Sequence, residues 1–167
     1  MTQDSSDIRA LVPRMPNATC PIAGIAAGGQ PAFSDLEALA HAGYRTVVDM
    51  RAPGEPRGYD EPAAVRRIGM DYVNLPVGPG PITDREFDLY RAIANDPERW
   101  PLLVHCASGN RVGPFLVAQM ILDAGMTPRE AIDLAVRGGL RSPQLAQLAL
   151  DYVARHGVDV SGEGAAV

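Results

Sequence analysis

The sequence lacks several residue types that whole classes of proteins require. All 15 basic residues are arginine, which excludes a Schiff-base lysine and the lysine of a Walker phosphate loop. The two cysteines, Cys20 and Cys106, lie far apart and belong to no paired spacing, so we expect neither a disulfide framework nor a thiolate zinc site. The three histidines are scattered without metal-ligand spacing, and we expect no metal and no cofactor.

Positive charge and long apolar runs are also scarce. The formal net charge is −5 and the isoelectric point is near 5.1, which argues against a nucleic-acid partner because phosphate backbones bind clustered positive charge. The first residues, MTQDSSDIRA, lack the basic segment and apolar core of a signal peptide, and no later apolar run reaches membrane-spanning length. We therefore expect a soluble, cytoplasmic protein without membrane contact. The sequence does not indicate its oligomeric state.

The chain has the size and composition of one ordinary domain, with 167 residues of which 46% are hydrophobic. We expect a loose N-terminal segment at 1–16, a catalytic domain at 17–157 and a flexible tail at 158–167. Short apolar runs, typical of strands, alternate with amphipathic stretches, typical of helices. The predicted strands are 22–26, 45–50, 71–77 and 101–106, and the predicted helices are 34–42, 62–68, one from 83, 112–125, 127–137 and 142–157. This rhythm predicts an α/β fold with a central, mostly parallel sheet flanked by helices.

The segment around Cys106 contains the chemistry. Cys106 ends the predicted strand PLLVHC, and the turn ASGN leads into a long helix. Ligands of open α/β sheets bind outside the carboxyl ends of the strands. A thiolate at such a place is stabilised by unpaired backbone N–H groups and by the helix dipole. The alternative is that Cys106 is only a small buried hydrophobic residue, but the setting between His105, Gly109 and Arg111 argues for a nucleophile.

The residues after Cys106 are suited to binding an anion. Arg111 supplies a planar, bidentate donor. The segment before it is small and polar enough for its amides to curl around an oxyanion. The predicted anion-binding residues are Ala107, Ser108, Gly109, Asn110 and Arg111.

The motif HCASGNR resembles the signature loop of the dual-specificity and tyrosine phosphatases. AIDLAVRGGLRSPQLAQLALDYV is similar to the C-terminal helices of these phosphatases, and GGQPAFSDLEALAHAGYRTVVDMRAPGE with DYVNLPV resembles the bacterial beta-lactamase-hydrolase-like domain. The resemblance implies a dual-specificity-phosphatase-like fold with Cys106 as nucleophile and Arg111 binding the oxyanion. It also implies a phosphorylated small molecule or phosphoprotein as substrate, and a His105 that orients the loop or tunes the thiolate.

Three departures from this family limit the resemblance. Four residues separate Cys106 from Arg111, where phosphatases have five. The shorter spacing also occurs in rhodanese sulfurtransferases and in the beta-lactamase-hydrolase-like family. Val112 stands where phosphatases place Ser or Thr. The loop that carries the family's general acid reads GPGP at 78–81, so the nearest candidate acid is Asp84. The alternative for Asp84 is a first-turn carboxylate that interacts with the helix dipole.

Several assignments stay open at the sequence level. Arg51 could contact substrate from the same sheet edge, or form a salt bridge with Glu55, and Arg137 and Arg141 resemble positions that brace the loop. The preferred hypothesis is a cysteine-dependent phosphatase acting through a cysteinyl-phosphate. The alternatives are a rhodanese-like sulfurtransferase or persulfide-handling protein, which needs no aspartate acid, and a non-catalytic anion-binding pseudophosphatase.

Overall fold

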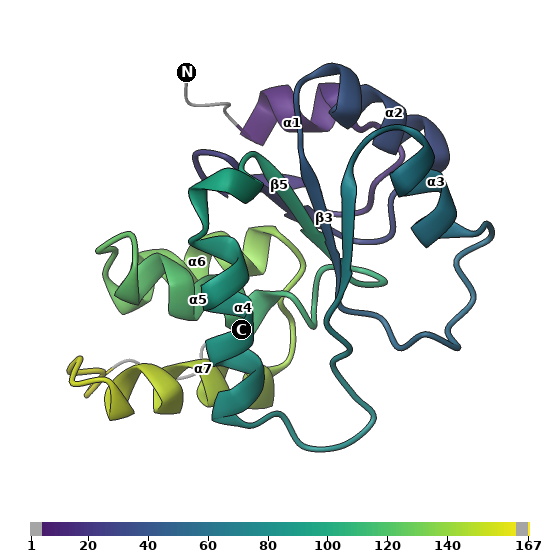
Figure 1. Cartoon of the computed structure of the whole chain (residues 1–167). Coiled ribbons are helices and arrows are strands. Elements are labelled where there is room, and N and C mark those ends of the chain that lie inside the picture. The colour runs from purple at the N-terminus through teal and green to yellow at the C-terminus, as the bar shows by residue number, and fades with distance from the viewer. Residues whose placement is uncertain (1–4, 163–166) are drawn as a thin grey trace.

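The chain folds around a five-stranded sheet with the order β1-β2-β5-β3-β4 (Figure 1). This computed structural model describes residues 5–162 and 167. Only the β1–β2 pair is antiparallel, and the other three pairs are parallel. The strands are β1 (Thr19–Ile22), β2 (Ile25–Gly28), β3 (Thr46–Asp49), β4 (Asp71–Asn74) and β5 (Leu102–His105). The predicted mostly parallel sheet is therefore confirmed.

The parallel strands are in register, so their carboxyl ends meet along one edge. His105 of β5 pairs with Gly28 of β2 and with Asp49 of β3, and Asp49 pairs with Asn74 of β4. Because the strands are in register, their last residues form a single row along this edge. The loops that follow β2, β3, β4 and β5 therefore all leave from the edge at which Cys106 lies.

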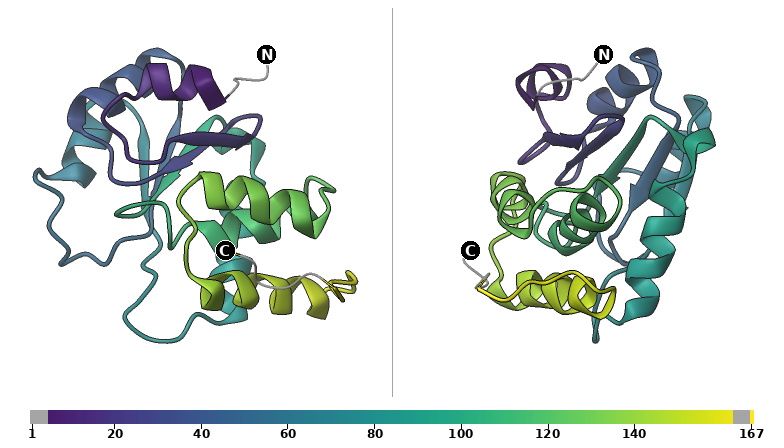
Figure 2. Two further views of the ribbon diagram at one scale, coloured as in Figure 1. Left: turned by 180° about the vertical axis from the view of Figure 1, so that it is seen from behind. Right: turned by 90° about the vertical axis from the view of Figure 1, so that its left-hand side faces the viewer.

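Helices cover both faces of the sheet (Figures 1 and 2). One face packs against α4, α5, α6 and α7, and the other against α1, α2 and α3. Strand side chains alternate between the two cores, as the pleat requires: Leu102 and Val104 lie in the first, Leu103 in the second. The helices are α1 (Ser5–Leu11), α2 (Phe33–His41), α3 (Glu61–Arg67), α4 (Asp84–Ala94), the 3₁₀ turn η1 (Pro97–Arg99), α5 (Gly113–Leu122), α6 (Pro128–Arg137) and α7 (Pro143–Arg155).

The helix that follows Cys106 is the most deeply buried. Every residue of α5 from Gly113 to Ile121 is buried, because α4, α6, α7 and the sheet surround it. Buried apolar side chains of this size contribute about 1.5–3 kcal/mol each. The N-terminal end of α5 is thus held firmly beneath the loop it follows.

Two predicted helix starts are confirmed by their caps. Thr83 with Glu86, and Thr127 with Glu130, form capping boxes at the start of α4 and α6. Among the helices of the described residues, none is long and apolar enough to cross a membrane.

The predicted strand at 22–26 is wrong in its extent. The run is divided between β1 and β2, which form a hairpin around Gly24. Gly24 has a φ of 86°, and a Cβ there would collide with the ring of Trp100, so the chain must turn at this glycine. Trp100 in turn donates from Nε1 to the carbonyl of Ala94. The apolar pattern identified a strand but concealed the turn inside it.

The N-terminal segment differs from the loose chain expected for 1–16. Helix α1 packs on the second core, where Ile8, Val12 and Met15 are at most 5% exposed. Their spacing of four and three residues is the helical period. The sequence did not suggest a helix here, because α1 is short and contains several polar residues. Residues 1–4 and 163–166, which include part of the expected flexible tail, lie outside the described residues.

Candidate active site

Cys106 follows β5 directly and is 1% exposed. Its Sγ accepts a hydrogen bond from the backbone N–H of Gly109 at 3.1 Å. A donor aimed at sulfur favours the thiolate over the thiol. The loop at residues 106–111 therefore curls its backbone toward Cys106, as the sequence predicts.

Side chains from outside the 106–111 loop fix its shape. Asn17 donates from Nδ2 to the Ser108 carbonyl at 2.8 Å. The Asn110 Oδ1 accepts from the backbone N–H groups of Arg141 at 2.8 Å and Ser142 at 3.2 Å. Arg141 also donates from Nη1 to the Ser108 Oγ at 3.0 Å. Arg141 thus braces the loop, and the side chain of Asn110 ties it to the start of α7.

Only glycine fits at position 109, for two reasons. Its φ is 93°, in the left-handed region that favours glycine. A Cβ at this position would overlap the carbonyl oxygen of Gly138. The loop conformation that brings the Gly109 amide to sulfur therefore requires glycine.

Arg111 is paired with a carboxylate that the sequence did not assign to it. Its Nη2 lies 2.8 Å from Glu55 Oε1, and its Nη1 lies 2.9 Å from Glu55 Oε2. This bidentate hydrogen bond holds the pKa of Glu55 down at about 2 and raises the pKa of Arg111. An interaction with the Cys106 side chain contributes to this rise in the pKa of Arg111, whereas burial opposes it.

Arg51 supports the same pair from the end of β3. It lies 3.4 Å from Glu55 through Nε and donates from Nη1 to Gln30 Oε1 at 3.1 Å. The salt bridge between Arg51 and Glu55, one of two sequence-level alternatives, is therefore present. Two arginines converge on Glu55, so a concentrated positive potential surrounds this carboxylate.

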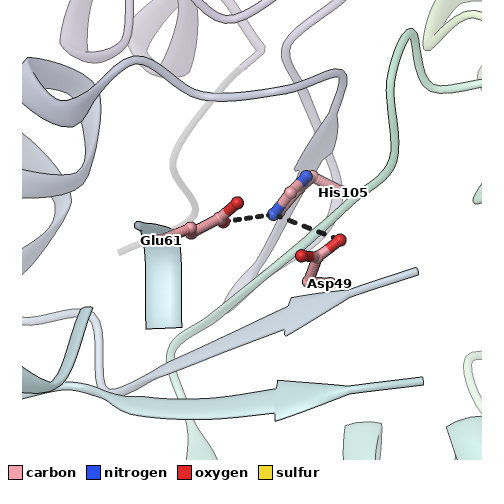
Figure 3. A group of neighbouring side chains, drawn as sticks. All are labelled: Asp49, Glu61 and His105. Atoms are coloured by element: carbon pink, nitrogen blue, oxygen red, sulfur yellow. Dashed lines mark hydrogen bonds and ion pairs between the residues drawn. The ribbon is translucent and has the colours of Figure 1, made fainter. Parts of the chain in front are cut away.

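A fully buried group of titratable residues lies at the carboxyl ends of β3 and β5 and the start of α3 (Figure 3). His105, Glu61 and Asp49 are all 0% exposed. The His105 Nε2 is 2.6 Å from Glu61 Oε1 and 3.9 Å from Asp49 Oδ1, while Nδ1 is 3.1 Å from the carbonyl oxygen of Cys106. His105 thus contacts the peptide group of Cys106, and its role in orienting the loop stays a prediction.

Asp84 lies in an ion pair with a C-terminal helix. It is the first residue of α4, and its Oδ1 is 2.5 Å from Nη2 of Arg155. The hydrogen bond from Arg155 lowers the pKa of Asp84, which favours the ionised carboxylate over a proton donor. The pairing favours the helix-terminus role over the catalytic one.

Sequence reasoning missed two acidic residues of this site. Glu55 was considered only as a partner of Arg51, and Glu61 was not singled out. Glu55 lies in a proline-rich loop and Glu61 opens α3, where an acid is common at any helix N-terminus. Neither position carries a local signal, because both roles depend on contacts with residues more than 40 positions away.

Curated proteins with similar sequences are known for part of this chain. A beta-lactamase hydrolase-like protein of Xylella fastidiosa is 34% identical over 107 residues, which is 61% of this chain and 24% of that protein. A protein of the same name from Agrobacterium fabrum is 29% identical over 99 residues, covering 57% of this chain and 23% of that protein. The chain thus spans about a quarter of the length of these curated relatives.

Solved structures share the fold at low identity. A putative DUF442 phosphatase from Shewanella putrefaciens superposes with a TM-score of 0.74 at 18% identity, covering 90% of this chain and 99% of that one. The catalytic core of the Saccharomyces cerevisiae PP-IP phosphatase SIW14 gives a TM-score of 0.71 at 15% identity, with coverages of 83% and 86%. The fold is thus that of tyrosine and dual-specificity phosphatases. Residues 21–149 match the family described as DSP-PTPase phosphatase fused to NAD+ kinase, and the chain belongs to that family.

Proposed function

We propose that the chain is a cysteine-dependent phosphatase that hydrolyses a phosphomonoester through a cysteinyl-phosphate. In the first step the Cys106 thiolate attacks phosphorus, so an S–P bond forms while the P–O ester bond breaks. The loop amides and Arg111 hold the equatorial oxygens. Water then attacks phosphorus, which releases phosphate and restores the thiolate.

One observation carries this proposal: the Gly109 N–H donates to the Cys106 sulfur, and the guanidinium of Arg111, which interacts with Cys106, is bound to the Glu55 carboxylate. The Glu55 carboxylate engages two of the five N–H groups of the guanidinium. The group is thus already oriented for planar oxyanions. The family's phosphatase fold supports the same conclusion.

The proton for the leaving group is the open step. Asp84 stays a prediction for this role, but its ion pair with Arg155 opposes it. Leaving groups of low basicity, such as aryl oxides, depart without an acid. We therefore expect the best activity on phosphate esters with acidic leaving groups.

Two solved relatives indicate the range of substrates to test. SIW14 is a PP-IP phosphatase, and TpbA of Pseudomonas aeruginosa, with a TM-score of 0.63 at 22% identity and coverages of 87% and 86%, was solved with pTyr. We propose a phosphorylated small molecule or phosphoprotein as the substrate class. A cytoplasmic location remains a prediction.

Sulfur transfer is the second candidate, and the four-residue spacing between Cys106 and Arg111 favours it. The reduced protein should be assayed in parallel with an aryl phosphate and with thiosulfate plus a thiol acceptor, using Cys106→Ser as the blank. We expect Cys106-dependent phosphate release to exceed sulfur transfer. A persulfide on Cys106 with dominant sulfur transfer would replace the phosphatase assignment.

An Asp84→Asn variant completes this test. A general acid should matter little for the aryl phosphate and greatly for an alkyl phosphate, because only the alkoxide needs a proton on departure. If Asp84 only stabilises the N-terminus of α4, its replacement should change the turnover of both substrates alike. Arg155→Gln is the matched control, since it removes the same ion pair and leaves the carboxylate.

A further inference from the structure

The buried residues Asp49, Arg57, Glu61 and His105 form a charged group, here called the buried quartet, that the reaction described above does not use directly. Arg57 lies 2.7 Å from Asp49 Oδ2 and 3.5 Å from Glu61 Oε2. Its side chain is 7% exposed, and the two carboxylates are fully buried. Charges buried to this extent are stable only when they are paired.

The hydrogen bonds of His105 define its protonation. Its two ring nitrogens face two oxygens: the carbonyl of Cys106 at 3.1 Å and the carboxylate of Glu61 at 2.6 Å. A carbonyl and a carboxylate only accept hydrogen bonds, and a neutral imidazole has a single N–H. The other oxygen of Glu61, Oε2, accepts from Gln30 Nε2 at 2.8 Å and lies 3.5 Å from Arg57, contacts that suit a carboxylate. With Glu61 in this form, both contacts of His105 are satisfied only by the imidazolium.

The charge balance of the quartet agrees with this form. The quartet contains two carboxylates and the Arg57 guanidinium, whose pKa is raised by its hydrogen bond to Asp49 although burial opposes the rise. A neutral His105 would leave a net charge of −1 in the interior, whereas the imidazolium brings the sum to zero. Neighbouring Tyr72 and Gln30 are neutral donors, to Asp49 at 2.6 Å and to Glu61 at 2.8 Å; burial raises the pKa of Tyr72, which keeps its hydroxyl protonated.

A metal ion is a weaker explanation of the same cluster. Candidate ligand atoms of Asp49, Glu61 and His105 lie within 4.8 Å of one another. However, Arg57 and Tyr72 both donate to Asp49 Oδ2, and the Arg51 amide donates to Oδ1 at 2.8 Å. The oxygens that a cation would need already accept protein donors, and Arg57 already balances one of the two carboxylate charges.

We propose that Glu61 is a positioning residue that holds His105 as an imidazolium, and that this cation stabilises the Cys106 thiolate through the Cys106 carbonyl. The inference rests on the proposed function, in which Cys106 is the nucleophile. A positive charge next to the peptide group of the nucleophile favours the anionic sulfur. It adds to the Gly109 amide and to Arg111, which act on the thiolate from the loop side, whereas Glu55 neutralises part of the Arg111 charge.

The first test measures the thiolate fraction of Cys106 against pH. It uses the ultraviolet absorbance of the thiolate in the wild type and in Glu61→Gln, each corrected with its own Cys106→Ser blank. If Glu61 acts through His105, the imidazolium is lost in Glu61→Gln and the thiolate-to-thiol ratio at about pH 6 falls about tenfold. Asp35→Asn is the matched control: it removes another buried carboxylate, one that caps α2, and should leave the ratio unchanged.

The direction of the change separates this role from simple electrostatics. Removing a negative charge near Cys106 would by itself increase the thiolate fraction. An unchanged or larger thiolate fraction in Glu61→Gln would therefore overturn the inference while leaving the nucleophile assignment intact. A wild-type Cys106 that is a thiol at about pH 6 would instead overturn the proposed function.

A second measurement needs no stable Glu61 variant. ¹⁵N-labelled histidine in the wild type reports the protonation of both ring nitrogens by NMR, and His105→Gln identifies the His105 signals among the three histidines. We expect the imidazolium pattern for His105 at about pH 7, where a free histidine is mostly neutral. A neutral tautomer at that pH would overturn the inference.

Discussion

Two loops meet at the carboxyl edge of the sheet, and they are held in different ways. The 106–111 loop is fixed by hydrogen bonds to backbone groups and by a glycine that contacts the Gly138 carbonyl. The 51–60 loop, which links β3 to α3, is held by charged side chains. Arg57 donates to the carbonyls of Arg51, Ala52, Pro53 and Glu55 and to the Asp49 carboxylate.

One loop therefore depends on the shape of its backbone, and the other depends on paired charges. The 106–111 loop depends on local backbone geometry, so a small change in shape should remove its function. The 51–60 loop places Glu55 against Arg111 and Arg57 against Asp49, so its function depends on charge pairing. The four predictions below test this division, starting with the largest expected effect.

Gly109→Ala should reduce kcat about a thousandfold, because the loop amides that stabilise the oxyanion must move when a Cβ meets the Gly138 carbonyl. Steady-state assays on an aryl phosphate measure the loss. Gly125→Ala is the control, since Gly125 has a φ of 72° but open space around it. Equal losses in the two variants would mean that backbone strain, and not the loop contact, causes the effect.

Arg111→Lys should reduce kcat about a hundredfold, because an ammonium keeps the charge but cannot present two parallel donors to oxyanion oxygens. The thiolate fraction of Cys106 should change much less than kcat. Near wild-type turnover in this variant would make Arg111 a structural residue.

Arg57→Gln should lower the free energy of unfolding by about 3–5 kcal/mol, because it leaves the buried Asp49 without its cation. Urea denaturation measures the change. Arg155→Gln breaks the Arg155–Asp84 pair, whose side chains are about half exposed, and should lower the free energy of unfolding much less, because exposed ion pairs contribute little. Similar losses of unfolding free energy in the two variants would contradict the view that Arg57 holds the 51–60 loop in place.

Glu55→Gln should lower kcat about tenfold, because Arg111 loses the partner that orients its fork. The variant should also flatten the pH dependence of stability. The folded pKa of Glu55 is about 2, below its ordinary value of 4.5, so the pair's contribution is complete above 4.5 and disappears as pH falls toward 2. Unfolding measured at about pH 6 and about pH 3 should therefore show a smaller difference in the variant than in the wild type.

The same division explains what the sequence could predict. The strand before Cys106 and the helix after it are local patterns, and they locate the 106–111 loop. The helix starts at Thr83 and Thr127 are local patterns too. The partners of Arg111 and His105 are Glu55 and Glu61, both more than 40 residues away. No helical or strand period connects such residues, so their pairing emerges only when the sheet register brings β3 and β5 together.

The position of the single tryptophan makes the protein a convenient object for spectroscopy. Trp100 precedes β5 and Cys106 follows it, so the strand separates the indole from the thiolate by roughly 20 Å at about 3.3 Å per residue. The indole covers the Gly24 turn and is therefore sensitive to loss of the β1–β2 hairpin. Its emission should report unfolding while remaining almost silent to an anion in the 106–111 loop, so that stability and binding can be recorded in one sample without interference.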